Sequence, residues 1–261
     1  MKFGMPTLVE CKDIYDCVNV AERFGLDFIE INMSFPNYQV SALNVDDLKR
    51  ITKEKGIFYT IHADEQMNPF DFNAAVSECY FKNMAECIDF ALALNIPVIN
   101  IHLLKGVYVT LPGKVILLTD VYKEEYISRV KAFIRMCEDK IGNAPLKIAI
   151  ENVDSNAFTE SQLVALEYFM ASPVFALTLD VGHDDCLDGK DRHVFEKYPQ
   201  KLVHMHLHDS DGKHAHLPLG EGKVNIKEKM AMLKHGETCL VEVKTIKGLE
   251  DSMKYLGDNN F

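Results

Sequence analysis

Several classes of protein are disfavoured by features that this 261-residue sequence lacks or contains in small number. Basic residues are scarce, 28 against 39 acidic ones, and the net charge of −11 disfavours a protein whose task is to hold nucleic acid. No uninterrupted apolar run is long enough to span a bilayer, and the opening MKFGMPTLVE has no apolar signal segment. Neither GxGxxG nor GxxxxGK(S/T) follows a predicted strand, so a nucleotide-binding fold has no motif in its support. We therefore expect a protein that has no membrane partner.

Cysteine is present, but without the spacing of a disulfide framework. The number of cysteines is odd and no CxxC pair occurs. The seven are Cys11, Cys17, Cys79, Cys87, Cys137, Cys186 and Cys239. We interpret them as reduced thiols, mostly buried small hydrophobes, in a cytoplasmic protein.

Short β-rich runs alternate with amphipathic helical patterns along the whole chain. We predict strands at residues 2–9, 27–33, 57–63, 97–104, 146–153, 175–183, 202–209 and 238–244. A helical pattern follows each strand, and four of these patterns end on a glycine suited to a helix C-cap, namely Gly25, Gly56, Gly142 and Gly236. Eight such units predict one closed (β/α)8 TIM barrel, with residues 1–261 as a single domain. An open, doubly wound sheet is the alternative.

Metal-ligating side chains stand at or just after the carboxyl ends of these strands, the edge at which barrel active sites form. They are Glu30, His62, His102, Glu151, Asp180, His183, His206, His214, His216 and Glu242. Any one of them has an ordinary structural explanation, such as a hydrogen-bonded core histidine or a carboxylate that caps a helix. Together they predict bound cations, because burying so many ionisable groups at one edge without a partner is costly. Imidazole and carboxylate ligands suit zinc, manganese or cobalt.

The order of these motifs resembles that of the xylose-isomerase-like TIM barrels, a superfamily of sugar and sugar-phosphate isomerases and epimerases that also includes endonuclease IV. The resemblance is carried by His62, His102, Glu151-Asn152, Asp180-Val-Gly-His183, the segment from His206 to Gly222, and Glu242. In the epimerase branch it implies one divalent metal, bound by Glu151, Asp180, His206 and Glu242, with His183 at the substrate. In the nuclease branch it implies up to three zinc ions, with additional ligands at His62, His102, His183, His214 and His216. His214 stands where the nuclease has an aspartate.

The stretch VHMHLHDSDGKHAHLPLGEG, residues 203–222, holds five of the ten histidines. His204, His206 and His208 alternate with aliphatic residues, so a strand places them on one face. The resemblance assigns His206 to the metal; His204 then lies one layer deeper as a core residue, and His208 stands beside a metal ligand at most. With residues 213–217 extended, His214 and His216 face the same way and could form a three-imidazole site with His183.

Three functions are compatible with these residues. The primary interpretation is a metal-dependent isomerase or epimerase that moves a proton at a carbon next to a carbonyl of a sugar or sugar phosphate. Glu151 and Glu242 are then the general base and acid, and the substrate is bound by Glu30, His62, His102 and His183. The alternatives are an endonuclease IV-like zinc phosphodiesterase acting on abasic DNA, and a binding protein that keeps the ligands without turnover.

Local sequence favours the isomerase over the nuclease. DVGH and HLHDSDGKHAHLPLGEG resemble the epimerase branch, and Asp64 and Glu65 after His62 would repel a phosphate backbone. Nucleic acid is therefore not the expected partner; a small-molecule sugar or sugar phosphate is. We expect residues 64–73 and 105–117 to select it. Lysines near the strand ends, Lys105, Lys114, Lys213 and Lys223, could bind one phosphate or be solvated surface residues.

Overall fold

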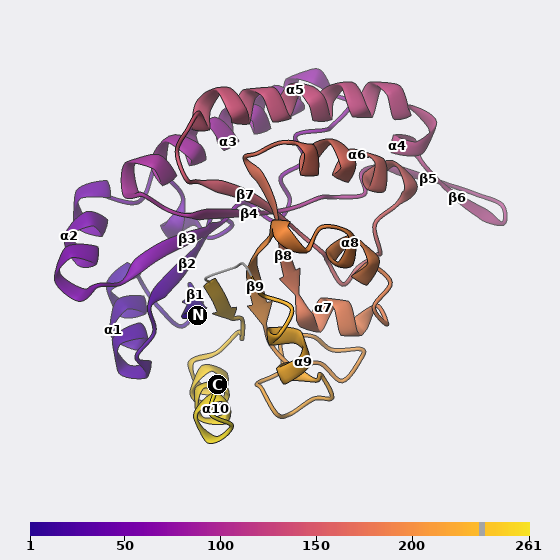
Figure 1. Ribbon diagram of the computed structural model, residues 1–261. Helices are drawn as coiled ribbons and strands as arrows, with labels where there is room; N and C mark the ends of the chain where they lie inside the picture. Colours follow the sequence, from indigo (N-terminus) through magenta and orange to yellow (C-terminus); the bar gives the residue numbers. More distant parts are fainter. Residues whose placement is uncertain (235–237) are drawn as a thin grey trace.

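A barrel of parallel strands forms the centre of the computed structural model, which describes residues 1–234 and 238–261 (Figure 1). Within these ranges eight strands pair in the order β1-β10-β9-β8-β7-β4-β3-β2 and close on themselves, which confirms the predicted TIM barrel. They are β1 (Lys2–Pro6), β2 (Phe28–Asn32), β3 (Phe58–His62), β4 (Val98–His102), β7 (Lys147–Glu151), β8 (Phe175–Asp180), β9 (Leu202–Leu207) and β10 (Thr238–Val241). Each lies inside its predicted range and ends earlier, because the last predicted residues belong to the loops of the barrel mouth.

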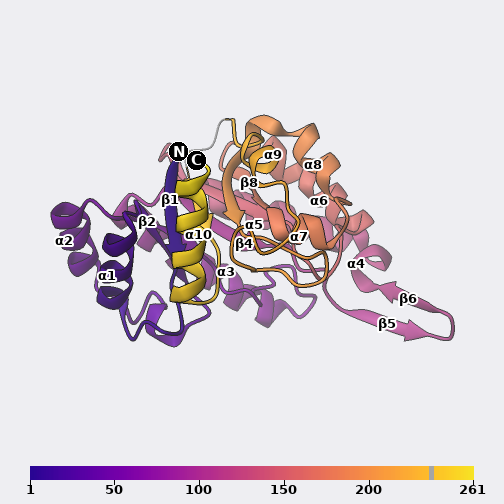
Figure 2. The same cartoon turned by 90° about the horizontal axis from the view of Figure 1, so that it is seen from below.

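Helices surround the barrel on its outside (Figures 1 and 2). They are α1 (Ile14–Phe24), α2 (Val45–Lys55), α3 (Ala74–Leu94), α4 (Leu118–Val121), α5 (Lys123–Ile141), α6 (Glu160–Ala171), α7 (Val181–Cys186), α8 (Arg192–Lys197), α9 (Ile226–Met230) and α10 (Ile246–Asp258). Gly25 and Gly56 end α1 and α2 in the left-handed conformation, and Gly142 ends α5, as predicted. Gly236 lies outside the described residues. No helix in the described part of the chain is long and apolar enough to cross a membrane.

The strands are buried on both faces, as expected where helices cover a closed parallel sheet. All six residues of β8 are buried. Inside the barrel, the small residues Val98, Ala149 and Ala176 form an apolar cluster toward the amino ends of the strands. Because side chains alternate between the two faces of a strand, Ala149 shares its face with Glu151, and Ala176 shares its face with Asp180. The barrel interior therefore changes from apolar to ionisable toward the carboxyl ends.

Two segments differ from the sequence expectations. The strand predicted for residues 175–183 ends at Asp180, where the chain turns into α7 and the Asp180 side chain caps the helix by accepting a hydrogen bond from His183 N at 2.7 Å. Residues 105–117, expected as a loop, contain β5 (Tyr108–Leu111) and β6 (Lys114–Leu117). These two strands form an antiparallel hairpin that projects from the barrel (Figure 2). All seven cysteines lie in the described ranges and are free thiols.

Candidate metal centre

Four ionisable side chains converge at the carboxyl ends of neighbouring strands. Glu151 ends β7, Asp180 ends β8, His206 lies on β9, and Glu242 directly follows β10. One ligand atom from each residue lies within 4.8 Å of those of the other three, and all four residues are buried. His206 Nδ1 is 2.8 Å from Glu242 Oε2, 3.2 Å from Glu151 Oε1 and 3.9 Å from Asp180 Oδ2. Three carboxylates thus face a single imidazole nitrogen.

Strand register brings these residues together. In the β8–β9 pair Asp180 lies opposite His206, and in the β9–β10 pair His206 lies opposite Leu240, two residues before Glu242. In the β4–β7 pair His102 lies opposite Glu151. Because parallel strands carry their carboxyl ends to one edge of the barrel, residues far apart in the sequence meet at one mouth.

The electrostatics of this cluster call for a cation. Burial alone would lower the pKa of His206, but Glu151, Glu30 and Glu242 outweigh it and hold that pKa well above its usual range. Burial would raise the pKa of Glu242, but Lys244 and His206 outweigh it and hold that pKa well below its usual range. Within the described residues Glu242 Oε2 makes no hydrogen bond of suitable angle, although it lies 2.8 Å from His206 Nδ1. A proton on His206 balances only part of the buried negative charge.

The donor set fits a divalent metal. Three carboxylates and one imidazole, with no thiolate among them, suit manganese, zinc or cobalt rather than a structural thiolate zinc site. Glu151, Asp180, Glu242 and His206 would hold the ion. The residues expected as its ligands are therefore brought together by the fold.

Glu30 lies beside His204 and His206. Its Oε2 accepts a hydrogen bond from Thr60 Oγ1 at 2.8 Å and lies 3.1 Å from His204 Nε2, while its Oε1 lies 3.1 Å from His206 Nε2. His204 Nδ1 is in turn 2.7 Å from Thr238 Oγ1. Both Glu30 and His204 are buried. The carboxylate expected to bind substrate thus contacts the side of His206 opposite the ligand cluster, where it can fix the imidazole.

His62 and His102 surround the second oxygen of Glu151. The Nε2 atom of each lies 3.4 Å from Glu151 Oε2, and the two rings meet edge to face. Asn100 Nδ2 donates to the same oxygen. Burial would lower the pKa of His62, but Glu151 outweighs it and raises the value to about 9. This cluster could contact substrate hydroxyls or hold a further cation with Glu151.

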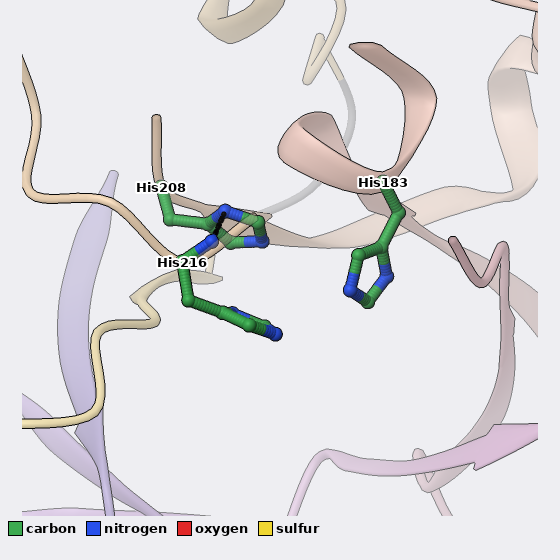
Figure 3. Close-up of side chains that lie close together, drawn as sticks. All are labelled: His183, His208 and His216. Atoms are coloured by element: carbon green, nitrogen blue, oxygen red, sulfur yellow. Dashed lines mark hydrogen bonds between the residues drawn. The ribbon is translucent and has the colours of Figure 1, made fainter. Parts of the chain in front are cut away.

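A third group contains His183, His208 and His216 (Figure 3). His208 Nδ1 accepts a hydrogen bond from the His216 backbone N–H at 2.8 Å, and His208 Nε2 lies 2.9 Å from Asp180 Oδ2. Because Nδ1 accepts, the proton of a neutral His208 is on Nε2 and is donated to Asp180. His208 therefore supports a ligand carboxylate and links it to the loop that carries His216.

The rings of His183 and His216 remain available at the mouth. His183 Nδ1 lies 3.2 Å from the Asn152 carbonyl oxygen, to which it can donate, and this leaves Nε2 with a lone pair. Burial lowers the pKa of His216 to about 4, so this imidazole is neutral at pH 7. Both can accept a hydrogen bond from a hydroxyl group or ligate a metal.

His214 is not brought to the third group. Its side chain is 74% exposed, and its Nδ1 lies 2.8 Å from Asp211 Oδ2. The expected combination of His183, His214 and His216 is therefore not the one the fold assembles, since His208 is the third imidazole. The i, i+2 spacing of His206 and His208 on one strand face is the sequence signal that places His208 there.

The mouth opens into a cavity of about 240 Å³ lined by His62, Glu65, Gln66, His102, Leu104, Glu151, Val153, Asp154, Ser155, His183, His216, Glu242 and Lys244. Sequence reasoning missed Lys244, whose Nζ lies 2.7 Å from Glu242 Oε1. The signal was its i+2 spacing from Glu242 in VEVK, which places both side chains on one face of an extended segment. A larger hollow of about 950 Å³ lies beside α5 and α6, and none of its lining residues belongs to the ligand cluster. We therefore take the smaller cavity as the site.

Comparison with known proteins places this chain among barrels of the same kind. A curated protein of Methanocaldococcus jannaschii, itself of uncharacterized function, is 24% identical over 269 residues, covering 97% of this chain and 86% of the relative. The crystal structure of a D-tagatose 3-epimerase-like protein superposes with a TM-score of 0.77 at 22% identity, covering 99% of this chain and 96% of that one. D-psicose 3-epimerase of Clostridium cellulolyticum H10, solved with D-tagatose, gives a TM-score of 0.74 at 14% identity, covering 100% and 98%. The family model described as xylose isomerase-like TIM barrel matches residues 18–258, and the chain belongs to that family.

Proposed function

We propose that the protein is a divalent-metal-dependent epimerase or isomerase of sugars, which moves a proton at a carbon next to a carbonyl group. The observation that carries the proposal is the buried cluster of Glu151, Asp180, His206 and Glu242, two members of which also line the cavity at the mouth. Structural neighbours that are sugar epimerases support the same reaction class.

In the proposed mechanism the two glutamates exchange a proton with a bound sugar. A divalent ion at the cluster supplies a Lewis acid that acidifies the C–H bond next to the carbonyl. A carboxylate oxygen of one glutamate takes this proton, and the carboxylic acid of the other returns a proton to the opposite face of the same carbon, which gives the epimer. Return of the proton to the neighbouring carbon gives the isomer instead.

The imidazoles of the mouth would orient the substrate. His62, His102, His183 and His216 line the cavity around the glutamates, and each offers a ring nitrogen that can bond a hydroxyl group. The loop residues Gln66 and Ser155 also line the cavity, as does Lys244. A small polyhydroxy compound matches a cavity of about 240 Å³ with this many polar groups.

Replacing each glutamate by glutamine tests the proposal. Glu151→Gln and Glu242→Gln should each lower the incorporation of solvent deuterium into a ketose by about 10²-fold or more, because an amide is neither a base nor a good metal ligand. Proton NMR of a ketose panel in D₂O measures the exchange, and metal content is measured on the same samples. Glu54→Gln on α2, which makes the same chemical change away from the cavity, is the matched control. Exchange that survives in both variants would refute the two-carboxylate mechanism.

A zinc phosphodiesterase acting on abasic DNA is the second candidate. The grouping of His62 and His102 around Glu151 favours it, because this cluster could hold an additional ion. The acidic lining of the cavity opposes it, since a DNA backbone requires lysine and arginine at its phosphates. Metal analysis separates the two functions: one ion per chain supports the epimerase, and three zinc ions per chain support the phosphodiesterase.

A further inference from the structure

The mouth of the barrel is rich in carboxylates, which would repel a negatively charged substrate. We propose that the site takes uncharged polyhydroxy carbonyl compounds and excludes sugars that carry a phosphate or carboxylate group. The inference rests on the proposed function, since it names the substrate class of the same site.

Carboxylates dominate the cavity lining. Four of its residues are acidic, Glu65, Glu151, Asp154 and Glu242, whereas Lys244 is the one lysine or arginine among the described lining residues. That lysine is already engaged, because its Nζ lies 2.7 Å from Glu242 Oε1. An anionic ligand would have to displace Glu242 from Lys244 or approach the other carboxylates without a cation of its own.

A bound metal ion does not reverse this balance. The three ligand carboxylates, one divalent ion and Lys244 together carry no net charge. The charges of Glu65 and Asp154 remain unbalanced in this sum. Within the described part of the chain, the hydrogen bond that Glu65 Oε1 accepts comes from a neutral donor, Asn32 Nδ2 at 3.0 Å. Charges this close to a bound ligand lie within the screening distance of about 8 Å at physiological salt, so they repel an anion in the cavity.

The N-terminus of the helix that follows the eighth strand is occupied by other groups of the chain. TIM barrels commonly bind phosphate at the loops after the seventh and eighth strands and at a helix N-terminus there. Here the helix after the eighth strand is α10, and its Ile246 backbone N–H donates to Glu10 Oε2 at 2.5 Å. The Gly248 backbone N–H donates to Thr245 Oγ1 at 3.0 Å. The Glu10 carboxylate and the Thr245 hydroxyl thus accept the hydrogen bonds that an anion at this helix N-terminus would accept.

None of the four lysines that could have bound a phosphate lines this cavity. Lys105 lines a neighbouring hollow that shares Gln66 and Ser155 with the cavity, and its Nζ lies 5.3 Å from the centre of the Tyr108 ring. Lys223 Nζ lies 4.0 Å from Asp185 Oδ2. Lys114 begins β6 in the projecting hairpin (Figure 2). Lys213 is exposed in the loop after β9, and it is not among the residues that line the cavity.

Binding of matched sugars tests the substrate class without requiring turnover. Isothermal titration of the Mn²⁺-loaded protein compares D-tagatose, D-allulose and D-fructose with their 6-phosphates. At least one free sugar should bind at least about tenfold more tightly than its phosphate, a difference of about 1.4 kcal/mol. A phosphate that binds as tightly as its parent sugar, or more tightly, overturns the proposal. Because binding is measured, a chain that selects free sugars but exchanges no proton loses only the proposed function.

Inorganic phosphate tests the role of Glu10 even where no sugar in the panel binds. The wild-type protein should show little broadening of the ³¹P resonance of phosphate, whereas Glu10→Gln should bind phosphate at least about fivefold more tightly, because a repelling carboxylate leaves the helix N-terminus. Glu54→Gln on α2 makes the same change in net charge away from the mouth and should bind as the wild type does. Equal phosphate binding by wild type and Glu10→Gln would contradict the assignment.

Discussion

The orientation of His206 depends on a carboxylate that does not belong to the ligand cluster. Its Nδ1 faces Glu151, Asp180 and Glu242, while its Nε2 lies 3.1 Å from Glu30 Oε1. Burial would raise the pKa of Glu30, but His206 and His204 outweigh it and lower that pKa, so Glu30 is ionised at pH 7. Within the described residues His206 Nε2 makes no hydrogen bond of suitable angle, so the ionised Glu30 acts on it through its charge. That charge favours the tautomer with its proton on Nε2, which leaves the Nδ1 lone pair for a metal.

Substitution of Glu30 should therefore weaken metal binding without removing a ligand. In Glu30→Gln the neutral amide no longer holds the Nε2 proton as strongly, and we expect the affinity for Mn²⁺ or Zn²⁺ to fall by about 10- to 100-fold. Competition with a chromophoric chelator measures this affinity. Glu54→Gln removes the same charge from α2, outside the cavity lining, and should change the affinity by less than about threefold, since it does not contact His206. Equal losses in the two variants would show that overall charge, rather than the position of His206, controls the metal.

The elements that could be predicted from the sequence are those with a strong pattern of their own. Buried strands and long amphipathic helices follow from alternation and capping residues, and the glutamates and His206 follow from their places at strand ends. Helix α7 spans only six residues, too few for a helical pattern to appear, and it begins directly at Asp180. The β5–β6 hairpin was missed because its apolar residues Tyr108, Val109 and Val115 are exposed, so they carry no pattern of burial.

The placement of His214 illustrates what sequence spacing leaves undetermined. An extended segment would have put His214 and His216 on one face. Instead Asp211 Oδ1 accepts hydrogen bonds from the backbone N–H groups of Lys213 and His214, both at 2.8 Å, and His216 has a left-handed φ of 59°. These two turns send His214 to solvent and His216 to the mouth. Their backbone conformations depend on Asp211 and on the bond to His208, which residue spacing does not encode.

Gly182 in α7 packs closely against His208, which directly follows β9, so a larger residue at position 182 should disturb the structure. A Cβ atom built on Gly182 would lie 2.1 Å from His208 Cε1, so Gly182→Ala must displace either α7 or the imidazole that supports Asp180. We expect a loss of about 1–3 kcal/mol in the free energy of unfolding and weaker metal binding, measured by urea unfolding and chelator competition. Gly257→Ala is the matched control, because no atom lies within 4 Å of its new Cβ in α10. That change should stabilise the protein by about 0.5–1 kcal/mol, as expected for alanine in place of glycine in a helix. If Gly182→Ala behaves like Gly257→Ala, His208 does not fix Asp180.

The whole molecule carries a net charge of −11, and part of that charge is concentrated in one buried cluster. Without a metal, protons on the histidines are the cations that the cluster can recruit. Burial would lower the pKa of His62, yet Glu151 raises it to about 9, and the pKa of His206 is also raised. Folding is therefore linked to proton uptake by these imidazoles at neutral pH, and a divalent ion competes for the same negative charge.

This linkage predicts a stronger pH dependence of stability for the metal-free protein than for the metal-loaded protein. A histidine with a folded pKa above its unfolded value of 6.5 adds stability that is fully present below pH 6.5 and is lost as the pH rises through about 9. For His62 this contribution is at most about 3 kcal/mol, so the Tm of the metal-free protein should fall by several degrees between pH 7 and pH 9. With Mn²⁺ bound, the ion balances the negative charge of Glu151 in place of the protons, and the Tm should change less over the same range.

The increase in Tm on adding metal should therefore be larger at pH 9 than at pH 7, measured by thermal unfolding with EDTA or with excess Mn²⁺. His62→Gln removes the titrating imidazole and should reduce the alkaline loss in EDTA. A metal-free protein whose Tm is constant or rises from pH 7 to pH 9 would show that these imidazoles do not carry the charge of the cluster.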